Sequence, residues 1–337
     1  MGKTNDAVTL ADVARAAGVS IATASKALNG KTVVREATRQ HVEEVARSLA
    51  FTPNPFARAL NSSITGTIGV LTADLANRFV VPILLGVEDA FGADSTSVIL
   101  TDARNDSIRE SHQLRTLMAK RVDGIIVLGD SDTSRPSITE QVTVPVAYAF
   151  AASQDPKDSS FTTDNSQGTD LAIDHLVSRG RRGIVAISGD PTFSAAVERL
   201  TGATQAMKRH GLQLVGGENL YGDWSEDWGR QCVHALIEAG HHFDAIFCAS
   251  DQIARGAIEQ LRDENLRVPE DVAVVGYDNW ELFSVHSRPP ITTIDMNLQE
   301  LGRAVARELI DAIKGQPQPG VHRVPVRLIP RASTTRL

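Results

Sequence analysis

Apolar residues recur at helical spacing in three short blocks near the start of the chain. The spacing predicts three short helices, with the blocks Leu10/Val13/Ala14/Ala17, Ala24/Ala27/Leu28 and Val42/Val45/Ala46/Leu49 as their inner faces. Thr9 can cap the first helix together with Asp12, and Ser20 can cap the second. Gly18 can take the left-handed conformation of a tight turn between them. Two helices joined by a short turn and closed by a third predict a helix-turn-helix unit.

A proline-rich segment, FTPNPFARALNSSITG, follows this unit. Pro55 is favourable at the first position of a helix, which we expect to be capped by Asn54 and to run to about Asn61. So short a helix is unstable alone in water, where even ~12–15 residues are marginal. We therefore expect residues 53–65 to be a hinge that folds only against a partner.

Beyond Gly66, β-rich runs alternate with amphipathic helices. The expected strands are TIGVLTA, SVILTDA, GIIVLGD, PVAYAF, GIVAISG, AIFCAS and VAVVGYD. The helices between them include VPILLGVEDAF, ESHQLRTLMAKR, GTDLAIDHLVSRG, AAVERLTGATQAMKRHG and DQIARGAIEQLRDE. This alternation predicts parallel sheets with helices on both faces. A ligand would then lie at the carboxyl ends of the strands, in the cleft between two lobes.

The expected organisation has three parts. We expect residues 1–52 to be the helix-turn-helix headpiece, 53–65 the hinge, and 66–337 the α/β core that carries the ligand cleft. Within the core we expect an N-lobe of about 66–165 and 295–320 and a C-lobe of about 166–294 and 321–337.

Charge separates the headpiece from the core. The whole chain carries a net charge of −7, but residues 1–60 hold eight basic and five acidic side chains. A basic end on an acidic body indicates that only the end meets nucleic-acid phosphates.

The sequence lacks the motifs that are typical of membrane proteins, secreted proteins and several classes of enzyme. No apolar run approaches the ~18 residues of a membrane span, and the start MGKTNDAVTLADV does not read as a signal peptide. We therefore expect a cytoplasmic protein without membrane contact. Cys232 and Cys248 lack disulfide or zinc-ligand patterns and are expected to be packed thiols. Phosphate-loop, dinucleotide, hydrolase and zinc-protease motifs are absent, so we expect no enzyme activity, no cofactor and no metal.

The segment VTLADVARAAGVSIATASKALNG closely resembles the headpiece of the lactose-repressor (LacI/GalR) family. TPNPFARAL looks like the hinge helix of that family, GYDNWELFSVHSRPPITTI like a characteristic core segment, and VRLIPRAST like the C-terminal ending. The resemblance covers nearly the whole chain. It implies an all-α helix-turn-helix headpiece and a two-lobed α/β core like that of periplasmic binding proteins, built of doubly wound parallel sheets. It also implies repressor activity, double-stranded palindromic operator DNA as partner, and a homodimer or a dimer of such dimers.

The resemblance makes the second helix the recognition helix in the major groove. Ile21, Ala22 and Lys26 match the positions that read base edges. Lys26 can donate to guanine, although it replaces the usual arginine and loses its bidentate geometry. Leu60 matches a hinge leucine that enters the minor groove. The predicted DNA contacts are Thr9, Ser20, Ile21, Ala22, Thr23, Ser25, Lys26, Asn29, Asn54, Phe56, Ala57 and Leu60. The alternatives are that Lys26 is a solvated surface charge and Leu60 a core residue.

The same resemblance implies a small-molecule effector, with a sugar or polyol favoured. Arg199 would fork onto ligand oxygens, Asp278 would accept from vicinal hydroxyls, and Trp224 would stack on the apolar face of a ring. The full predicted effector set is Arg78, Phe79, Phe150, Arg199, Trp224, Ser250 and Asp278. The alternatives are a structural ion pair for Arg199, a loop-capping acid for Asp278 and a core position for Trp224.

Phe150 departs from the sugar-binding pattern, because several sugar binders of the family have an acid there. A nucleoside- or purine-responsive regulator therefore stays open, as do control by a partner protein and a cytosolic sugar-binding protein or enzyme that does not bind DNA. We expect the ligand to change the angle between the N-lobes and so decide whether the paired hinges fold on DNA. The sequence leaves open the effector, the operator, and whether ligand releases the operator or holds it.

Overall fold

A computed structural model describes residues 8–28, 34–51, 64–92, 96–217 and 220–335 of the 337-residue chain. It divides into two compact units, Met1–Gly66 and Thr67–Leu337. The predicted hinge helix lies outside the described residues, as do the candidate DNA contacts Asn29, Asn54, Phe56, Ala57 and Leu60.

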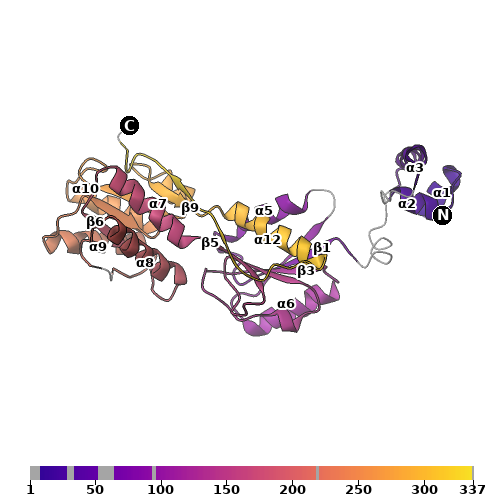
Figure 1. Ribbon diagram of the computed structural model, residues 1–337, viewed down its shortest axis with the longest axis horizontal. Coiled ribbons are helices and arrows are strands. Elements are labelled where there is room, and N and C mark those ends of the chain that lie inside the picture. The colour runs from indigo at the N-terminus through magenta and orange to yellow at the C-terminus, as the bar shows by residue number, and fades with distance from the viewer. Residues whose placement is uncertain (1–7, 29–33, 52–63, 93–95, 218–219, 336–337) are drawn as a thin grey trace, which may run out of the picture. The chain divides into compact units, whose positions relative to one another are not determined.

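The first unit packs three helices around a small apolar core (Figure 1). They are α1 (Leu10–Ala16), α2 (Ile21–Leu28) and α3 (Glu36–Ser48). The Oγ1 of Thr9 accepts from the main-chain N–H of Asp12 (3.4 Å), and the Asp12 carboxylate accepts from the N–H of Thr9 (3.0 Å). Gly18 has φ +65°, and Ser20 Oγ accepts from the Thr23 N–H (3.1 Å). The predicted helix-turn-helix is confirmed, with its caps and its turn.

The N-lobe of the second unit holds a six-stranded parallel sheet in the order β10-β5-β4-β3-β1-β2. Its strands are β1 (Thr67–Thr72), β2 (Ser97–Asp102), β3 (Gly124–Leu128), β4 (Val146–Ala149), β5 (Ser159–Thr163) and β10 (Gly320–Val324). Helices α5 (Val80–Phe91) and α12 (Leu298–Ile313) cover one face, and α6 (Ser107–Ala119) covers the other (Figure 1). A short 3-10 turn, η1 (Thr139–Gln141), precedes β4.

The C-lobe holds a five-stranded sheet in the order β11-β9-β8-β7-β6, in which only β11 is antiparallel. Its strands are β6 (Ile184–Ile187), β7 (Ala245–Cys248), β8 (Ala273–Tyr277), β9 (Thr292–Asp295) and β11 (Arg327–Ile329). Successive residues of β6 enter two different apolar clusters, so both faces of the sheet are buried. The helices are α7 (Asn165–Ser178) and α8 (Ser194–Arg209) on one face, α9 (Glu226–Glu238) and α10 (Asp251–Asp263) on the other, and the short α11 (Glu281–Ser284).

Each predicted strand of the core contains an observed strand, each predicted helix overlaps an observed helix, and the predicted α/β fold class is confirmed. One lobe boundary is wrong. We expected the chain to enter the C-lobe after residue 320, but β10 pairs with β5 in the N-lobe sheet, so the chain crosses only after Val324. The physical reason is that β10 is an edge strand of alternating exposed and half-buried residues, which gives no apolar run to detect.

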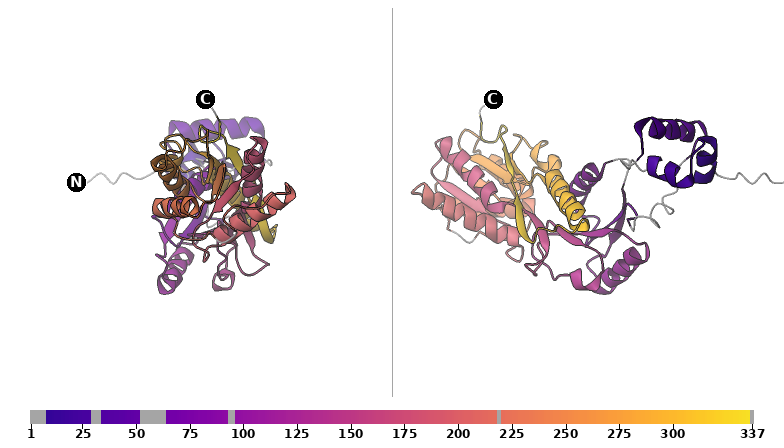
Figure 2. Two further views of the ribbon diagram at one scale, coloured as in Figure 1. Left: turned by 90° about the vertical axis from the view of Figure 1, so that its left-hand side faces the viewer. Right: turned by 45° about the vertical axis from the view of Figure 1, so that its right-hand side comes forward.

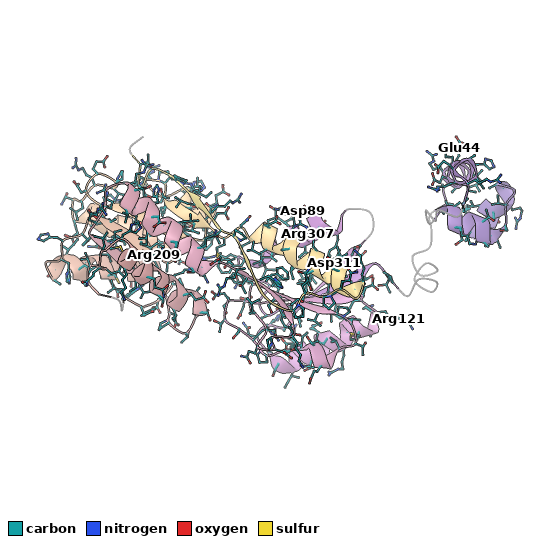
Figure 3. The ribbon with its side chains drawn as sticks, viewed as in Figure 1. Glu44, Asp89, Arg121, Arg209, Arg307 and Asp311 are labelled. Carbon is teal, nitrogen blue, oxygen red and sulfur yellow. The ribbon has the colours of Figure 1, made fainter. Side chains whose placement is uncertain are left out.

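Helices α5 and α12 pack backbone against backbone, although they are far apart in the sequence (Figure 2). A Cβ on Gly86 would lie 1.9 Å from the Gln299 carbonyl oxygen, and one on Gly302 2.0 Å from that of Ile83. Asp89 and Arg303 form an ion pair across the same contact (2.8 Å), and Figure 3 labels Asp89 and Arg307 on these two helices. The two glycines therefore set how closely the helices approach.

We expect Gly302→Ala to lower the free energy of unfolding by about 2–3 kcal/mol, because the helices must separate to admit the methyl group. Urea unfolding followed by circular dichroism measures this. Gly202→Ala is the matched control, since its Cβ would meet only the Thr169 side chain at 3.1 Å. An equal loss for both variants would contradict the prediction.

Both cysteines are buried and free, and burial raises the pKa of the Cys232 thiol to about 12. Over the residues that the structure describes, no group of His, Cys, Asp and Glu side chains is arranged to hold a metal ion. Over the same residues, no helix has the length and apolar character needed to cross a bilayer.

Candidate functional site

A cavity of about 410 Å³ opens between the two lobes of the core. Most of its lining comes from loops that follow the strands, at their carboxyl ends, as expected for open parallel sheets, and Arg199 reaches it from α8. All of the predicted effector contacts line this one cavity, namely Arg78, Phe79, Phe150, Arg199, Trp224, Ser250 and Asp278.

Arg199 is buried, although it is charged; only 4% of it is exposed. Its Nη1 donates to the Ala249 carbonyl oxygen (2.7 Å) and to the Asp278 carboxylate (3.2 Å), and its Nε donates to Asn165 (3.0 Å). The guanidinium lies 3.6 Å from the centre of the Tyr277 ring. Arg199 is thus both a member of a buried ion pair and a part of the cavity wall, held in one orientation by charge-assisted hydrogen bonds.

The loop that carries Asp278 is bent into an unusual conformation. Asp278 and Asn279 have backbone φ angles of +104° and +53°, which residues other than glycine rarely adopt. The fully buried Asp251 holds the bend, because its carboxylate accepts from the Trp280 N–H (2.7 Å) and the Thr293 hydroxyl (2.6 Å). Burial, reinforced by the nearby Asp278, raises the pKa of Asp251 well above its usual value. The strained loop turns the Asp278 carboxylate toward the cavity.

Arg331, in the segment VRLIPRAST, supports the same loop from behind. Its guanidinium donates to the Asn279 side chain (2.7 Å) and to the Ile291 carbonyl oxygen (2.8 Å). The C-terminal segment therefore contributes to the shape of the cavity without lining it.

Arg78 joins the two lobes across the cavity. It comes from the N-lobe loop after β1, and its Nη2 donates to Asp278 of the C-lobe. Its guanidinium lies between the rings of Phe79 (4.4 Å) and Trp280 (4.2 Å). Its Nε is buried and has no hydrogen-bond partner in the described structure. We call this contact the Arg78 bridge.

A second contact, the Asp132 bridge, ties the loop after β3 to the start of α8. Helix α8 has no side-chain cap of its own. The Asp132 carboxylate instead accepts from the Ala195 N–H (2.9 Å), and Thr133 Oγ1 accepts from the Ser194 N–H (3.2 Å). Burial raises the pKa of Asp132, and the charge of Arg199 opposes the shift. The N-lobe loop thus satisfies two orphan amides of a C-lobe helix, one with the Asp132 carboxylate and one with the Thr133 hydroxyl.

Aromatic rings form much of the remaining wall. Phe79 and Phe150 are in tilted contact (4.9 Å between centroids), and Phe193 meets Trp224 edge to face (6.1 Å). An aromatic wall with a few converging polar groups suits a small ligand with both apolar and hydroxylated faces.

In the first unit, α2 presents a small exposed surface. Ile21 is 56% exposed, and Ala22 and Lys26 are exposed beside it, while Ala24 and Ala27 are fully buried. The helix is therefore oriented with the three predicted base readers away from its core. The other described candidates are caps or partly buried residues of the same region, namely Thr9, Ser20, Thr23 and Ser25.

Comparison with known proteins agrees with this geometry. Residues 9–54 match the family model "Bacterial regulatory proteins, lacI family", and residues 173–334 match "Periplasmic binding protein-like domain". The ribose operon repressor of Escherichia coli (strain K12) is 36% identical over 326 residues, which cover 96% of this chain and 97% of the relative. The chain belongs to the LacI family. As such it is a DNA-binding transcription regulator with an effector-binding core.

Solved structures of LacI-family proteins extend the match. The lac repressor dimer bound to operator and the anti-inducer ONPF superposes with a TM-score of 0.73 at 29% identity, covering 98% of this chain and 99% of the other. The complex of the transcriptional regulator CelR with cellobiose gives a TM-score of 0.64 at 31% identity, covering 97% and 99%. These relatives are regulators, which favours a regulatory role over an enzymatic one.

Several cavity residues were not predicted in this LacI-family core. They are Asp130, Asp132, Phe193 and Trp280, although each lies in the loop after a strand. Position after a strand is the only signal that the sequence carries for them, and it does not say which side chain of a loop turns inward.

Proposed function

We propose that this LacI-family regulator represses by binding a palindromic operator as a homodimer, and that a sugar or polyol in the lobe cavity sets its operator affinity. The observation that carries the proposal is the shared cavity, where Asp278 and Arg199 face aromatic rings. Among the relatives, one is a ribose operon repressor and another was solved with cellobiose. Both names favour a carbohydrate effector.

Exposed apolar side chains support a dimer. Val81 (58% exposed) and Leu85 (50%) lie one turn apart on α5, and Val98 (37%) lies on the edge strand β2. In the C-lobe, Leu282 and Val285 on and beside α11 are also exposed. Two bound headpieces hold DNA far more tightly than one, because the second binds intramolecularly.

A nucleoside is the second candidate. Phe150 stands where several sugar binders have an acid, and its contact with Phe79 gives a flat aromatic surface on which a base can stack. This alternative changes only the chemical class of the effector. The DNA-binding regulator and the cavity stay the same.

The experiment starts from in-vitro selection of DNA fragments by the full-length protein, followed by anisotropy titrations with D-ribose, D-glucose, myo-inositol, cellobiose and cytidine. We expect one selected palindrome, a steep fall of affinity with salt, and a sugar or polyol that changes operator affinity by about 5–150-fold. Cytidine as the only active compound would favour the nucleoside. No preference for any fragment over random competitor would contradict the proposal.

We expect Lys26→Ala to weaken specific operator binding by about 10–100-fold, because one hydrogen-bonding base reader is lost. The salt slope should fall by about 1 if Lys26 also neutralises a phosphate. Lys120→Ala is the matched control, since Lys120 is an exposed lysine of the core. Unchanged specific affinity of the Lys26 variant in the anisotropy titration would show that this lysine is only a solvated charge.

A further inference from the structure

We propose that Asp130 supplies the free N-lobe carboxylate of the cavity, and that the cavity therefore takes an uncharged polyhydroxylated molecule and rejects phosphorylated or carboxylated ones. The inference rests on the proposed polyol effector and adds a specificity residue and a charge rule to it.

The positions of Asp130 and Phe150 follow from the pairing of neighbouring strands. β3 and β4 are parallel, with Leu128 opposite Ala149, and the Gly129 N–H donates to the Ala149 carbonyl oxygen (3.0 Å). Asp130 and Phe150 thus leave the sheet at the same edge, and both line the cavity. The neighbouring strand β3 therefore brings a carboxylate to the cavity wall beside the Phe150 ring.

Gly129 allows this close approach. A Cβ at Gly129 would lie 2.3 Å from the Cβ of Ala151 and 2.9 Å from its backbone nitrogen. The loop after β3 is therefore pressed against the end of β4. The Asn77 side chain fixes it further by donating to the main-chain oxygen of Asp130 (2.6 Å).

The carboxylate of Asp130 is free to meet a ligand. Within the described ranges it takes part in no hydrogen bond and no ion pair, and the residue is half-buried. The other two acids of the cavity are already engaged, Asp132 by the start of α8 and Asp278 by two arginines. Asp130 is thus available to hydroxyl donors at once, whereas Asp278 must first give up an arginine. A carboxylate acceptor makes the stronger, charge-assisted bond.

The charges of the lining disfavour an anion. Three carboxylates face two guanidinium groups, and both Arg78 and Arg199 are already paired with Asp278. A phosphate would bring further negative charge into a partly desolvated site without a spare cation, which is costly. A neutral ligand avoids this cost.

A hydroxyl group also suits the cation of the N-lobe wall. The Arg78 guanidinium lines the cavity and carries N–H groups beyond the one that donates to Asp278. A hydroxyl both donates and accepts, so a polyol can donate to Asp130 and accept from Arg78. Phe79 and Trp224 then cover its apolar face.

The test uses isothermal titration calorimetry on the full-length protein. The probes are D-ribose, D-glucose and myo-inositol, each paired with its monophosphate ester. We expect at least one neutral probe to bind, and its ester to bind at least about 30-fold more weakly. Asp130→Asn should lower the affinity for the neutral probe by about 10–100-fold without moving the thermal unfolding midpoint. Glu140→Gln, an exposed N-lobe carboxylate-to-amide change, should leave affinity unchanged.

The outcomes separate this inference from the proposed function. If Asp130→Asn binds the neutral probe like the wild type while the probe still shifts operator affinity, the inference fails and the proposed function stands. If an ester binds as tightly as its parent polyol, the charge rule is wrong. If no probe binds the wild-type protein or shifts its operator affinity, the polyol effector fails and the inference falls with it.

Discussion

Replacing Arg199 by methionine will abolish the response of operator binding to the effector, with effector affinity falling by about 100-fold or more. The variant removes every donor that Arg199 aims at Asp278, Asn165 and the Ala249 carbonyl oxygen. It also leaves buried acceptors without partners, so we expect the free energy of unfolding of the core to fall by about 3 kcal/mol. Calorimetry with the bound polyol measures the first effect, and urea unfolding measures the second.

Arg209→Met is the control for this prediction. Arg209 lies in the last turn of the same helix (Figure 3) and pairs with Asp170 at the surface (2.7 Å), where ion pairs contribute little. The Arg209→Met variant should have the effector affinity and the free energy of unfolding of the wild-type protein. If the Arg199→Met variant stays folded and its operator affinity still changes when effector is added, Arg199 has only a structural role.

The second large effect is expected for Leu85→Glu. If the exposed apolar face of α5 forms the dimer, a buried glutamate charge in each copy will dissociate it. Operator affinity should then fall by about 10²–10⁴-fold, because the second headpiece no longer binds intramolecularly. Sedimentation velocity gives the oligomeric state, and anisotropy gives the affinity.

Ile108→Glu is the matched control. Ile108 is 81% exposed on α6, which covers the opposite face of the N-lobe sheet from α5. The Ile108→Glu variant should remain dimeric and should bind operator with wild-type affinity. A Leu85→Glu variant that remains dimeric would mean that the interface lies elsewhere.

Two contacts join the lobes of the core, the Arg78 bridge and the Asp132 bridge. Asp278 already accepts from Arg78 and Arg199, so a hydroxylated ligand that takes up Asp278 competes with the Arg78 bridge. The Asp132 bridge lies at the start of α8 and does not use Asp278. A ligand can therefore replace the Arg78 bridge while the Asp132 bridge persists. The ligand-bound and ligand-free cores would then differ in their contacts between the lobes, which coupling to DNA binding requires.

Sequence periodicity predicted most elements of the core that bury apolar residues, with helices α9 and α12 as exceptions. It did not predict β5, whose residues Ser159, Ser160 and Thr163 are polar yet buried, because Ser159 finds partners in Glu308 and the Gln318 carbonyl oxygen. Such partners come from distant parts of the chain and leave no local pattern. Helix α12 does carry a local signal, since Leu301, Val305 and Leu309 share one buried face, but the predicted helices do not include it.

Some residues of the candidate site could likewise be predicted from the sequence, and others could not. The predicted effector contacts came from motifs, and the cavity brings them together. Asp130 and Trp280 depend on how a loop is bent, which Gly129 and Asp251 determine through contacts with other strands. Those contacts are tertiary, so neither composition nor spacing could have shown them.

The most direct test of the account measures linkage in both directions on the full-length protein. One titration gives the factor by which the bound polyol changes operator affinity, and the other gives the factor by which operator changes polyol affinity. If the lobe cavity controls the headpieces, the two factors must be equal, and we expect about 5–150-fold. Identical polyol affinity with and without saturating operator would contradict the account.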